Sequence, residues 1–437
     1  MQHEMSGAPP AHRWWGAVVP GPDAEPSLTY DDALAFLFPR TTTIKFGLAT
    51  TRALLRSLGD PQDTIPMVHI GGTNGKGSVS TLVAAALAEA GWRVGLYTSP
   101  HLVSFRERIK VDGVPIGEDA VAMWTEQLQP LILERRATFF EASTAIALAD
   151  FAARGAEIAV VEVGLGGRLD STNVIRPLAS AVTKIARDHM KYLGDTLEKI
   201  ACEKAGIAKP ETPFIIGERD PGLVEVLRRE ARRAVARTTP GGRADIRVLP
   251  QEYEWTGALG LDGPHQRRNA GVAHGILMAL PAPYRPAPDA VARGFASAWI
   301  AGRLDRRGKW LFDVAHNPDG VRALTRAVES MTLPRPLHGL ISILGDKEWP
   351  EMLVELDRVL DRGVLTVAPT AASRGWDAAW LRRWLAKRAR PPAQAAWNLV
   401  PDFAEALAVV QQGAGTILVT GSFHTVGDVM DALGFSV

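Results

Sequence analysis

The fold of this chain follows from one glycine-rich stretch, His69-Ile70-Gly71-Gly72-Thr73-Asn74-Gly75-Lys76-Gly77-Ser78-Val79-Ser80. An apolar run (65–70) precedes the stretch, and a run rich in alanine and leucine (79–90) follows it. This order predicts a strand, a tight turn and the first turn of a helix. Glycines let the backbone approach a polyphosphate, so that amide N–H groups and the helix N-terminus hold its negative charge. Lys76 would add a positive charge on the terminal phosphates, and Ser78 a hydroxyl near a magnesium ion.

The stretch departs from the standard phosphate-loop pattern G-x-x-x-x-G-K-[ST]. Ile70 occupies the first glycine position, and Gly77 separates Lys76 from Ser78. The alternative is an ordinary turn between strand and helix, which would rarely need four glycines together with a lysine and a serine. We therefore interpret the stretch as a nucleotide-binding loop.

The composition describes a globular chain with no strong charge preference. Its 437 residues suffice for two or three domains, and a hydrophobic content of 46% supports substantial cores. The net charge of +1 gives no electrostatic reason to expect nucleic acid or an acidic membrane as a partner. Cys202 is the only cysteine, which excludes an intramolecular disulfide and fits a reducing cytoplasm. No apolar stretch reaches transmembrane length.

The order of predicted elements divides the chain into three parts. Residues 1–26 form a proline-rich extension, in which Trp14 and Trp15 are candidate docking residues. Strands then alternate with helices up to residue 236, which predicts a mainly parallel sheet covered on both faces. Residues 237–263 are glycine-rich and predict a small antiparallel patch. A second alternation begins near Trp310, so we expect a boundary near 296–302 that separates 27–298 from 299–437.

Polar side chains follow three of the predicted strands. Glu162 lies in the apolar run 158–163, where a buried carboxylate needs a partner or a metal. The alternative is an edge residue that reaches solvent. His189 and Ser99 follow two other strands, and open parallel sheets place ligands at these carboxyl ends. Together the three side chains would suit a magnesium shell, although a lone histidine is more often structural.

Three further charged residues are candidates of lower specificity. Lys204 lies on an otherwise apolar helix, where a lysine most often extends to the surface. Asp313 again ends a strand, in the segment Asp313-Val314-Ala315-His316-Asn317-Pro318. Arg303, near the expected boundary, would suit charge on a transferring phosphoryl group. A salt bridge across the domain interface is the alternative for Arg303.

Taken together, these residues resemble folylpolyglutamate synthase/dihydrofolate synthase, a branch of the Mur-ligase-like ATP-dependent amide ligases. The resemblance runs from about Leu28 to the C-terminus. It depends on the joint order of eight segments: Gly72-Thr73-Asn74-Gly75-Lys76-Gly77-Ser78, Thr98-Ser99-Pro100-His101-Leu102, Phe140-Glu141, 162–173, Asp188-His189, Glu203-Lys204-Ala205-Gly206, 312–318 and Gly421-Ser422-Phe423-His424-Thr425-Val426. Lys184 and Arg187 depart from the family pattern, which has small or apolar residues beside the histidine.

The resemblance implies a fold and a set of site residues. The fold would be α/β, with an N-terminal phosphate-loop ATPase domain and a smaller Rossmann-like C-terminal domain. Catalytic residues would be Lys76, Glu162, His189 and Lys204, the last carbamylated to help hold a second magnesium ion. Further positions match family residues for metal (Ser99, Glu162, His189), for ATP (Thr73, Asn74, Gly75, Lys76, Gly77, Ser78, Asn269, Arg303, Asp313) and for the pterin-bearing substrate (Thr138, Phe139, Phe140, Glu141, Leu169, Asp170, Ser171).

The implied reaction is ATP-dependent attachment of L-glutamate to a pterin-bearing carboxylate, in folate biosynthesis and one-carbon metabolism. The carboxyl substrate could be dihydropteroate, a reduced folate or both, and the Phe140-Glu141 segment favours both. We expect a monomer with small-molecule partners.

Three other functions fit the sequence less well. A cell-wall Mur ligase would need a UDP-binding domain, and only about 70 residues precede the loop. A phosphate-loop switch or kinase would not need the second α/β unit. A binding or scaffolding protein leaves Glu162, His189 and Lys204 unexplained.

Overall fold

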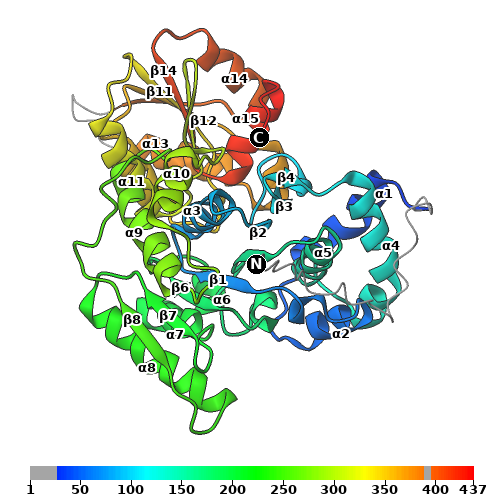
Figure 1. Cartoon of the computed structure of the whole chain (residues 1–437). Coiled ribbons are helices and arrows are strands. Elements are labelled where there is room, and N and C mark those ends of the chain that lie inside the picture. Colours follow the sequence, from blue (N-terminus) through cyan, green and yellow to red (C-terminus); the bar gives the residue numbers. More distant parts are fainter. Residues whose placement is uncertain (1–26, 388–394) are drawn as a thin grey trace, which may run out of the picture.

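The computed structural model describes residues 27–387 and 395–437. It contains two sheets, each covered by helices (Figure 1). The predicted extension 1–26, with Trp14 and Trp15, lies outside the described residues. No helix of the described ranges is long and apolar enough to cross a membrane.

The first sheet has eight strands in the order β4-β3-β2-β5-β1-β6-β7-β8. Six of them run parallel, while β3 and β4 are added antiparallel at one edge. The strands are β1 (Met67–Gly71), β2 (Val94–Tyr97), β3 (Ile109–Val111), β4 (Val114–Pro115), β5 (Ile158–Glu162), β6 (Ala179–Val182), β7 (Pro213–Ile216) and β8 (Asp245–Val248). The prediction of a mainly parallel sheet is confirmed. The predicted antiparallel patch at 237–263 is wrong, because β8 pairs parallel with β7.

Helices cover both faces of this sheet because its strands are apolar on both sides. One face carries α3 (Lys76–Glu89), α9 (Pro264–Ala279) and α10 (Pro288–Ser297). The other face carries α1 (Tyr30–Leu37), α2 (Ala49–Ser57), α4 (Glu118–Arg135) and α5 (Phe139–Ala153). The short α6 (Met190–Leu193), α7 (Leu197–Ala205) and α8 (Pro221–Thr238) pack beside β6 and β7. Single 3-10 turns are η1 (Phe38–Thr42), η2 (Pro61–Asp63), η3 (Phe105–Arg108) and η4 (Ser171–Val174).

The second sheet has six strands in the order β13-β12-β11-β14-β10-β9. Its strands are β9 (Arg303–Arg307), β10 (Trp310–Asp313), β11 (Leu337–Ile341), β12 (Arg362–Leu365), β13 (Ala396–Leu399) and β14 (Thr416–Thr420). All pairs are parallel except β9 with β10. Helices α11 (Pro318–Ser330), α12 (Trp349–Leu356) and α13 (Ala378–Lys387) cover one face; α14 (Phe403–Gln411) and α15 (Phe423–Ala432) cover the other, and η5 (Pro369–Arg374) follows β12.

The two sheets meet through loops at their strand ends. The loops after β1 and β6 of the first sheet contact the loop after β10 of the second. In Figure 1 the second sheet, coloured yellow to red, lies above α3 and α9. This arrangement places the glycine-rich loop between the two sheets.

Candidate active site between the two sheets

The glycine-rich loop joins β1 to α3, which begins at Lys76 with Gly75 as its N-cap residue. Two glycines are required by space and backbone conformation. Gly72 has φ +140°, and a Cβ atom there would lie 1.8 Å from the Thr183 hydroxyl. Gly75 has φ +90°, and a Cβ atom there would lie 2.5 Å from Oδ1 of Asn269. Glycine at position 75 therefore leaves room for the side chain of Asn269 against the loop backbone.

The loop is held in place by the residues that follow β6. The Thr183 hydroxyl donates to the carbonyl oxygen of Asn74 at 2.8 Å and lies 3.2 Å from that of Gly71. The amide of Thr73 donates to the carbonyl oxygen of Lys184 at 2.7 Å. The loop conformation thus depends on a neighbouring strand that lies more than a hundred residues further along the chain.

Glu162 lies beside the loop at the carboxyl end of β5. Its side chain is buried, with Oε1 3.9 Å from Nζ of Lys76 and Oε2 accepting the amide of Ser99 at 3.0 Å. Burial raises the pKa of Glu162, while Lys76 and the Ser99 amide oppose the rise. The alternative of an edge residue in solvent is wrong, because β5 lies between β2 and β1.

His189 and Lys204 approach the same loop from α6 and α7. His189 precedes α6 with φ 51°. Its side chain is 38% exposed, and desolvation of the covered part lowers the pKa of its imidazole, which favours the neutral form that binds metals. Among the described residues, no hydrogen bond joins His189 to Glu162 or Ser99. Lys204 donates to the carbonyl oxygen of Gly72 at 2.8 Å. The interpretation of Lys204 as a surface lysine is wrong, since the side chain is buried and burial lowers its pKa to about 7.

The predicted metal ligands fit a divalent cation by their chemistry. Glu162 has a buried carboxylate whose Oε1 lies 3.9 Å from the Lys76 ammonium, its one ion pair among the described residues, and Ser99 and His189 would add a hydroxyl and a neutral imidazole. Within 27–387 and 395–437, no three His, Cys, Asp or Glu side chains form a ready-made metal centre. Magnesium commonly takes one or two protein ligands and completes its shell with water and phosphate oxygens.

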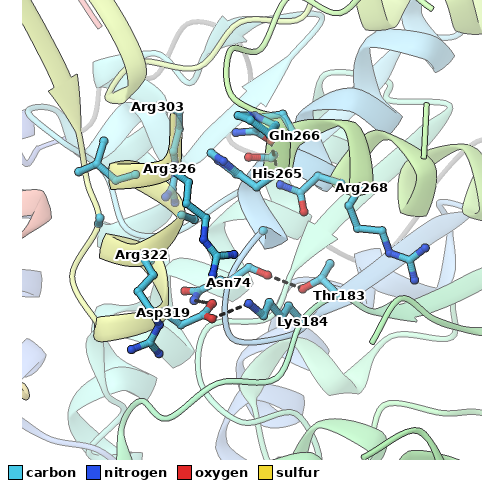
Figure 2. A pocket seen from close by; sticks show the side chains of 18 of the residues that line it. Asn74, Thr183, Lys184, His265, Gln266, Arg268, Arg303, Asp319, Arg322 and Arg326 are labelled. Atoms are coloured by element: carbon cyan, nitrogen blue, oxygen red, sulfur yellow. Dashed lines mark hydrogen bonds and ion pairs between the residues drawn. The ribbon is translucent and has the colours of Figure 1, made fainter. Parts of the chain in front are cut away.

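A cavity of about 480 Å³ opens from the glycine-rich loop toward the second sheet. Figure 2 shows side chains from α9 and α11 facing each other across it. Six of the nine predicted nucleotide residues line this cavity and divide into two walls, whereas Thr73, Lys76 and Gly77 do not line it. Asn74, Gly75, Ser78 and Asn269 line the side of the first sheet, and Arg303 and Asp313 line the side of the second. The sequence thus predicted residues that lie some 200 positions apart in the chain and line one cavity.

The two residues from the second sheet differ in how they are held. Asp313 is buried, and its carboxylate accepts the amides of Leu304 and Ala315 at 3.0 and 2.9 Å. The guanidinium of Arg303 lies 5.5 Å from the ring centroid of Phe423. Among the described residues, Arg303 forms no ion pair within 4.0 Å, which argues against the salt-bridge alternative.

The residues of α5 and its N-cap that are predicted to bind the pterin-bearing substrate have local structural partners. Thr138 is the N-cap residue of α5, and Thr138 and Glu141 form a reciprocal capping box with distances of 3.2 and 2.8 Å. Phe139 is buried in the core, whereas Phe140 is partly exposed and lies 6.0 Å from the Tyr97 ring. The predicted substrate role of this segment stays a prediction.

The residues after β5 that are predicted to bind the same substrate include a second N-cap residue. Asp170 caps η4 by accepting the amide of Thr172 at 3.0 Å, and it also accepts the amide of Leu165 at 2.7 Å. Leu169 and Ser171 flank it, and Ser171 is buried. None of these residues lines the cavity, so their substrate role also stays a prediction.

The structure adds residues that the sequence reasoning did not assign to the site. The buried carboxylate of Asp188 binds three side chains of the second unit: His316 at 3.1 Å, Asn317 at 3.2 Å and the ammonium of Lys347. Asn317 also exchanges two hydrogen bonds with Asn74, at 3.1 and 3.0 Å. Lys347 lies six residues beyond the end of the apolar strand β11. A polar residue after an apolar strand is the signal that singled out Ser99 and His189, and this signal could have found Lys347.

The chain matches two family models. The Mur ligase middle domain matches residues 70–248, and the Mur ligase glutamate ligase domain matches residues 302–423. A dihydrofolate synthase/folylpolyglutamate synthase of Mycobacterium tuberculosis is 36% identical over 84% of this chain and 83% of its own length. A probable bifunctional folylpolyglutamate synthase/dihydropteroate synthase of Haloferax volcanii is 37% identical over 76% of this chain, which spans only 42% of that protein's length.

Solved structures agree in fold. Folylpolyglutamate synthase of Mycobacterium tuberculosis with ADP superposes with a TM-score of 0.80 at 32% identity, over 93% of this chain and all of that one. Escherichia coli FolC with DHPP and ADP gives 0.79 at 29%, covering 93% and 98%. A bifunctional folylpolyglutamate synthase/dihydrofolate synthase with Mn, AMPPNP and L-glutamate gives 0.78 at 27%, covering 94% and 99%.

The two sheets, the glycine-rich loop and the cavity between them define an ATP-dependent ligase of the Mur type. Within that class, the chain belongs to the dihydrofolate synthase/folylpolyglutamate synthase family.

Proposed function

We propose that this chain attaches L-glutamate to the carboxyl group of a pterin-bearing acid, with conversion of ATP to ADP and phosphate. The observation that carries the proposal is the cavity whose walls are the phosphate loop and the strand ends of the second sheet. It is supported by family membership and by relatives solved with ADP, DHPP and L-glutamate. A switch or kinase would not need the second wall.

Residues of the glycine-rich loop and of the neighbouring strand ends would handle the phosphoryl transfer. A carboxylate is a poor acyl donor because oxide is a poor leaving group, so one of its oxygens first attacks the γ-phosphorus and ADP leaves. Lys76 begins α3, and its ammonium would neutralise charge on the transferring phosphoryl group, aided by loop amides and the helix N-terminus. A magnesium ion held by Ser99, Glu162 and His189 would supply further charge neutralisation.

The second half of the reaction needs protection from water. The glutamate amine attacks the acyl carbon of the resulting acyl phosphate, an amide bond forms, and phosphate and a proton leave. Asp188, Asn317 and Lys347 join the two units beside the loop, so the second unit would cover the reacting groups and limit hydrolysis. We place the division between the units at 298–299, between α10 and β9, and infer a monomer because one chain supplies both cavity walls.

We also propose that Lys204 is carbamylated. Its pKa is lowered to about 7, so a large fraction of the amine is neutral at physiological pH and can attack carbon dioxide, forming an N–C bond and releasing a proton. The product is a carboxylate beside the glycine-rich loop, where Lys204 now contacts Gly72. Such a group could share a second magnesium ion with the nucleotide.

The experiment is an assay of ADP release with ATP, magnesium and L-glutamate, and with dihydropteroate or tetrahydrofolate as the acceptor. We expect turnover with both acceptors, each requiring glutamate. ADP release that requires neither glutamate nor the pterin-bearing acceptor would overturn the proposal. Turnover with one acceptor only would restrict the chain to that half of the reaction.

A further inference from the structure

A buried chain of hydrogen bonds connects β1 to the loop after β5. His69 and Thr172 are both 0% exposed, and Nε2 of His69 lies 2.8 Å from the Thr172 hydroxyl. The same hydroxyl lies 2.5 Å from Oδ1 of Asp170. His69 and Thr172 are separated by 103 residues in the sequence, so only the folded chain makes this contact.

The direction of these hydrogen bonds follows from counting protons. The Asp170 carboxylate accepts the amides of Thr172 and Leu165, and the Thr172 hydroxyl, with its single proton, donates to it as a third donor. The hydroxyl oxygen must then accept from Nε2–H of His69. Nδ1 of His69 therefore carries no proton, and it lies buried without a hydrogen-bond partner among the described residues.

Packing alone does not account for a histidine here. Burial holds the imidazole neutral, with its pKa lowered to about 3, and leaves Nδ1 desolvated at a cost. A leucine on β1 would fill similar space without that cost. What only the histidine supplies is a fixed N–H donor aimed at Thr172.

The loop held by these hydrogen bonds lies against Phe140, in the segment predicted to bind the pterin-bearing substrate. Asp170 fixes the amide of Leu165, and the preceding Gly164 packs so closely on Phe140 that a Cβ atom would lie 2.3 Å from the ring. Two residues beyond His69, β1 ends at Gly71 and the glycine-rich loop begins. The bonds thus connect the strand that leads to the phosphate loop with the loop expected to hold the pterin-bearing acid.

We propose that His69 is a positioning residue for the acceptor substrate, acting through Thr172 on Asp170 and the loop 164–171. The proposal rests on the proposed function, which places the acceptor at this loop. His69 does not touch the substrate; it sets where the loop lies. Its loss would weaken acceptor binding and leave nucleotide binding nearly intact, since Asp170 and Thr172 do not line the nucleotide cavity.

The experiment compares apolar and donor-retaining variants at both positions. His69→Leu and Thr172→Val should each raise the KM for dihydropteroate about ten-fold, equivalent to about 1.4 kcal/mol, with the KM for ATP changed less than about two-fold. His69→Gln keeps an N–H at the place of Nε2, and Thr172→Ser keeps the hydroxyl, so both should restore most of the acceptor affinity. The double variant His69→Leu/Thr172→Val should have a KM for dihydropteroate no higher than that of either single variant, because both substitutions break the same chain of hydrogen bonds from His69 to Asp170.

Several outcomes would overturn the proposal. Equal increases in both KM values, a Gln variant as impaired as the Leu variant, or additive losses in the double variant would each show that His69 only fills space. Thermal unfolding of every variant separates such effects from loss of folded protein. Asp170→Ala distinguishes failure of the underlying function: if it leaves the KM for dihydropteroate unchanged, the acceptor does not bind at this loop.

Discussion

The contact between the two units at Asp188 gives the sharpest test of the reaction scheme. The Asp188 carboxylate and the Lys347 ammonium are 5% and 7% exposed and form an ion pair, with His316 at 3.1 Å on the same carboxylate. Burial alone would raise the pKa of Asp188, but the bond to His316 and the charge of Lys347 lower it well below its usual value of 3.8. Asp188→Asn keeps the size of the side chain and removes its charge.

The expected magnitude follows from burial. Removing one partner of a buried ion pair costs about 3–5 kcal/mol, because the other charge stays buried. The asparagine amide retains part of the hydrogen bonding, so we take about 3 kcal/mol, or about a 100-fold shift in the equilibrium between joined and separated units. Because the pKa of Asp188 is lowered in the folded protein, the contribution of its own ionisation is present well above the unfolded value of 3.8 and is lost progressively as the pH falls through and below that value.

The assay is steady-state ADP formation with glutamate and acceptor, and X-ray scattering reports the separation of the units. We expect kcat to fall about 100-fold and the radius of gyration to increase. The control is Lys184→Ala, since Lys184 is 54% exposed and pairs across the same two units with Asp319, which is 19% exposed. A pair with one solvent-exposed partner is worth about 1 kcal/mol, so its loss should cost about five-fold, measured at saturating ATP because both residues line the cavity. Equal losses in the two variants, or near-normal turnover of Asp188→Asn, would refute the reasoning.

Three other predictions concern single residues. Lys76→Ala should lower kcat by a factor of about 100 to 1000 without changing the circular dichroism spectrum, and near-normal glutamate incorporation would contradict its role. Gly164→Ala places a Cβ atom 2.3 Å from the Phe140 ring and should destabilise the fold by about 1–3 kcal/mol in urea unfolding. Gly117→Ala has 4.0 Å of clearance and should cost less than about 1 kcal/mol, the penalty of alanine at the N-cap position of α4. Between pH 7 and 10.5, the unfolded chain binds more protons at Lys204 than the folded chain does, because burial lowers the pKa of the folded amine. In bicarbonate-free buffer, the free energy of unfolding relative to that of Lys204→Met should therefore rise with pH across this window. A difference that stays constant with pH would show that the amine is not buried.

Several features of the fold and site could be predicted because their cause is local. The apolar runs and the glycines around Lys76 predicted strand, turn and helix, since propensity and backbone sterics act within a few residues. The pattern Thr138-Phe139-Phe140-Glu141 also contains a capping signal, which the structure shows as a closed capping box. The capping box was therefore predictable from the sequence, although we predicted only substrate binding for this segment.

Other features depend on contacts between distant residues. The pairing of β8 with β7 was predicted wrongly, because glycine-rich composition does not reveal which strand edge is free. The burial of Lys204 was not visible from its helix, since the cost of burying an amine depends on which residues pack around it.

The sequence by itself determined the chemistry-bearing residue types and the order of strands and helices, because each follows from short-range sterics and apolar periodicity. Only the tertiary structure decided that Asp188 binds His316, 128 residues away, and that His69 binds Thr172. Hydrogen bonds and ion pairs gain their strength from geometry and exclusion of water, and both exist only once the two sheets have packed.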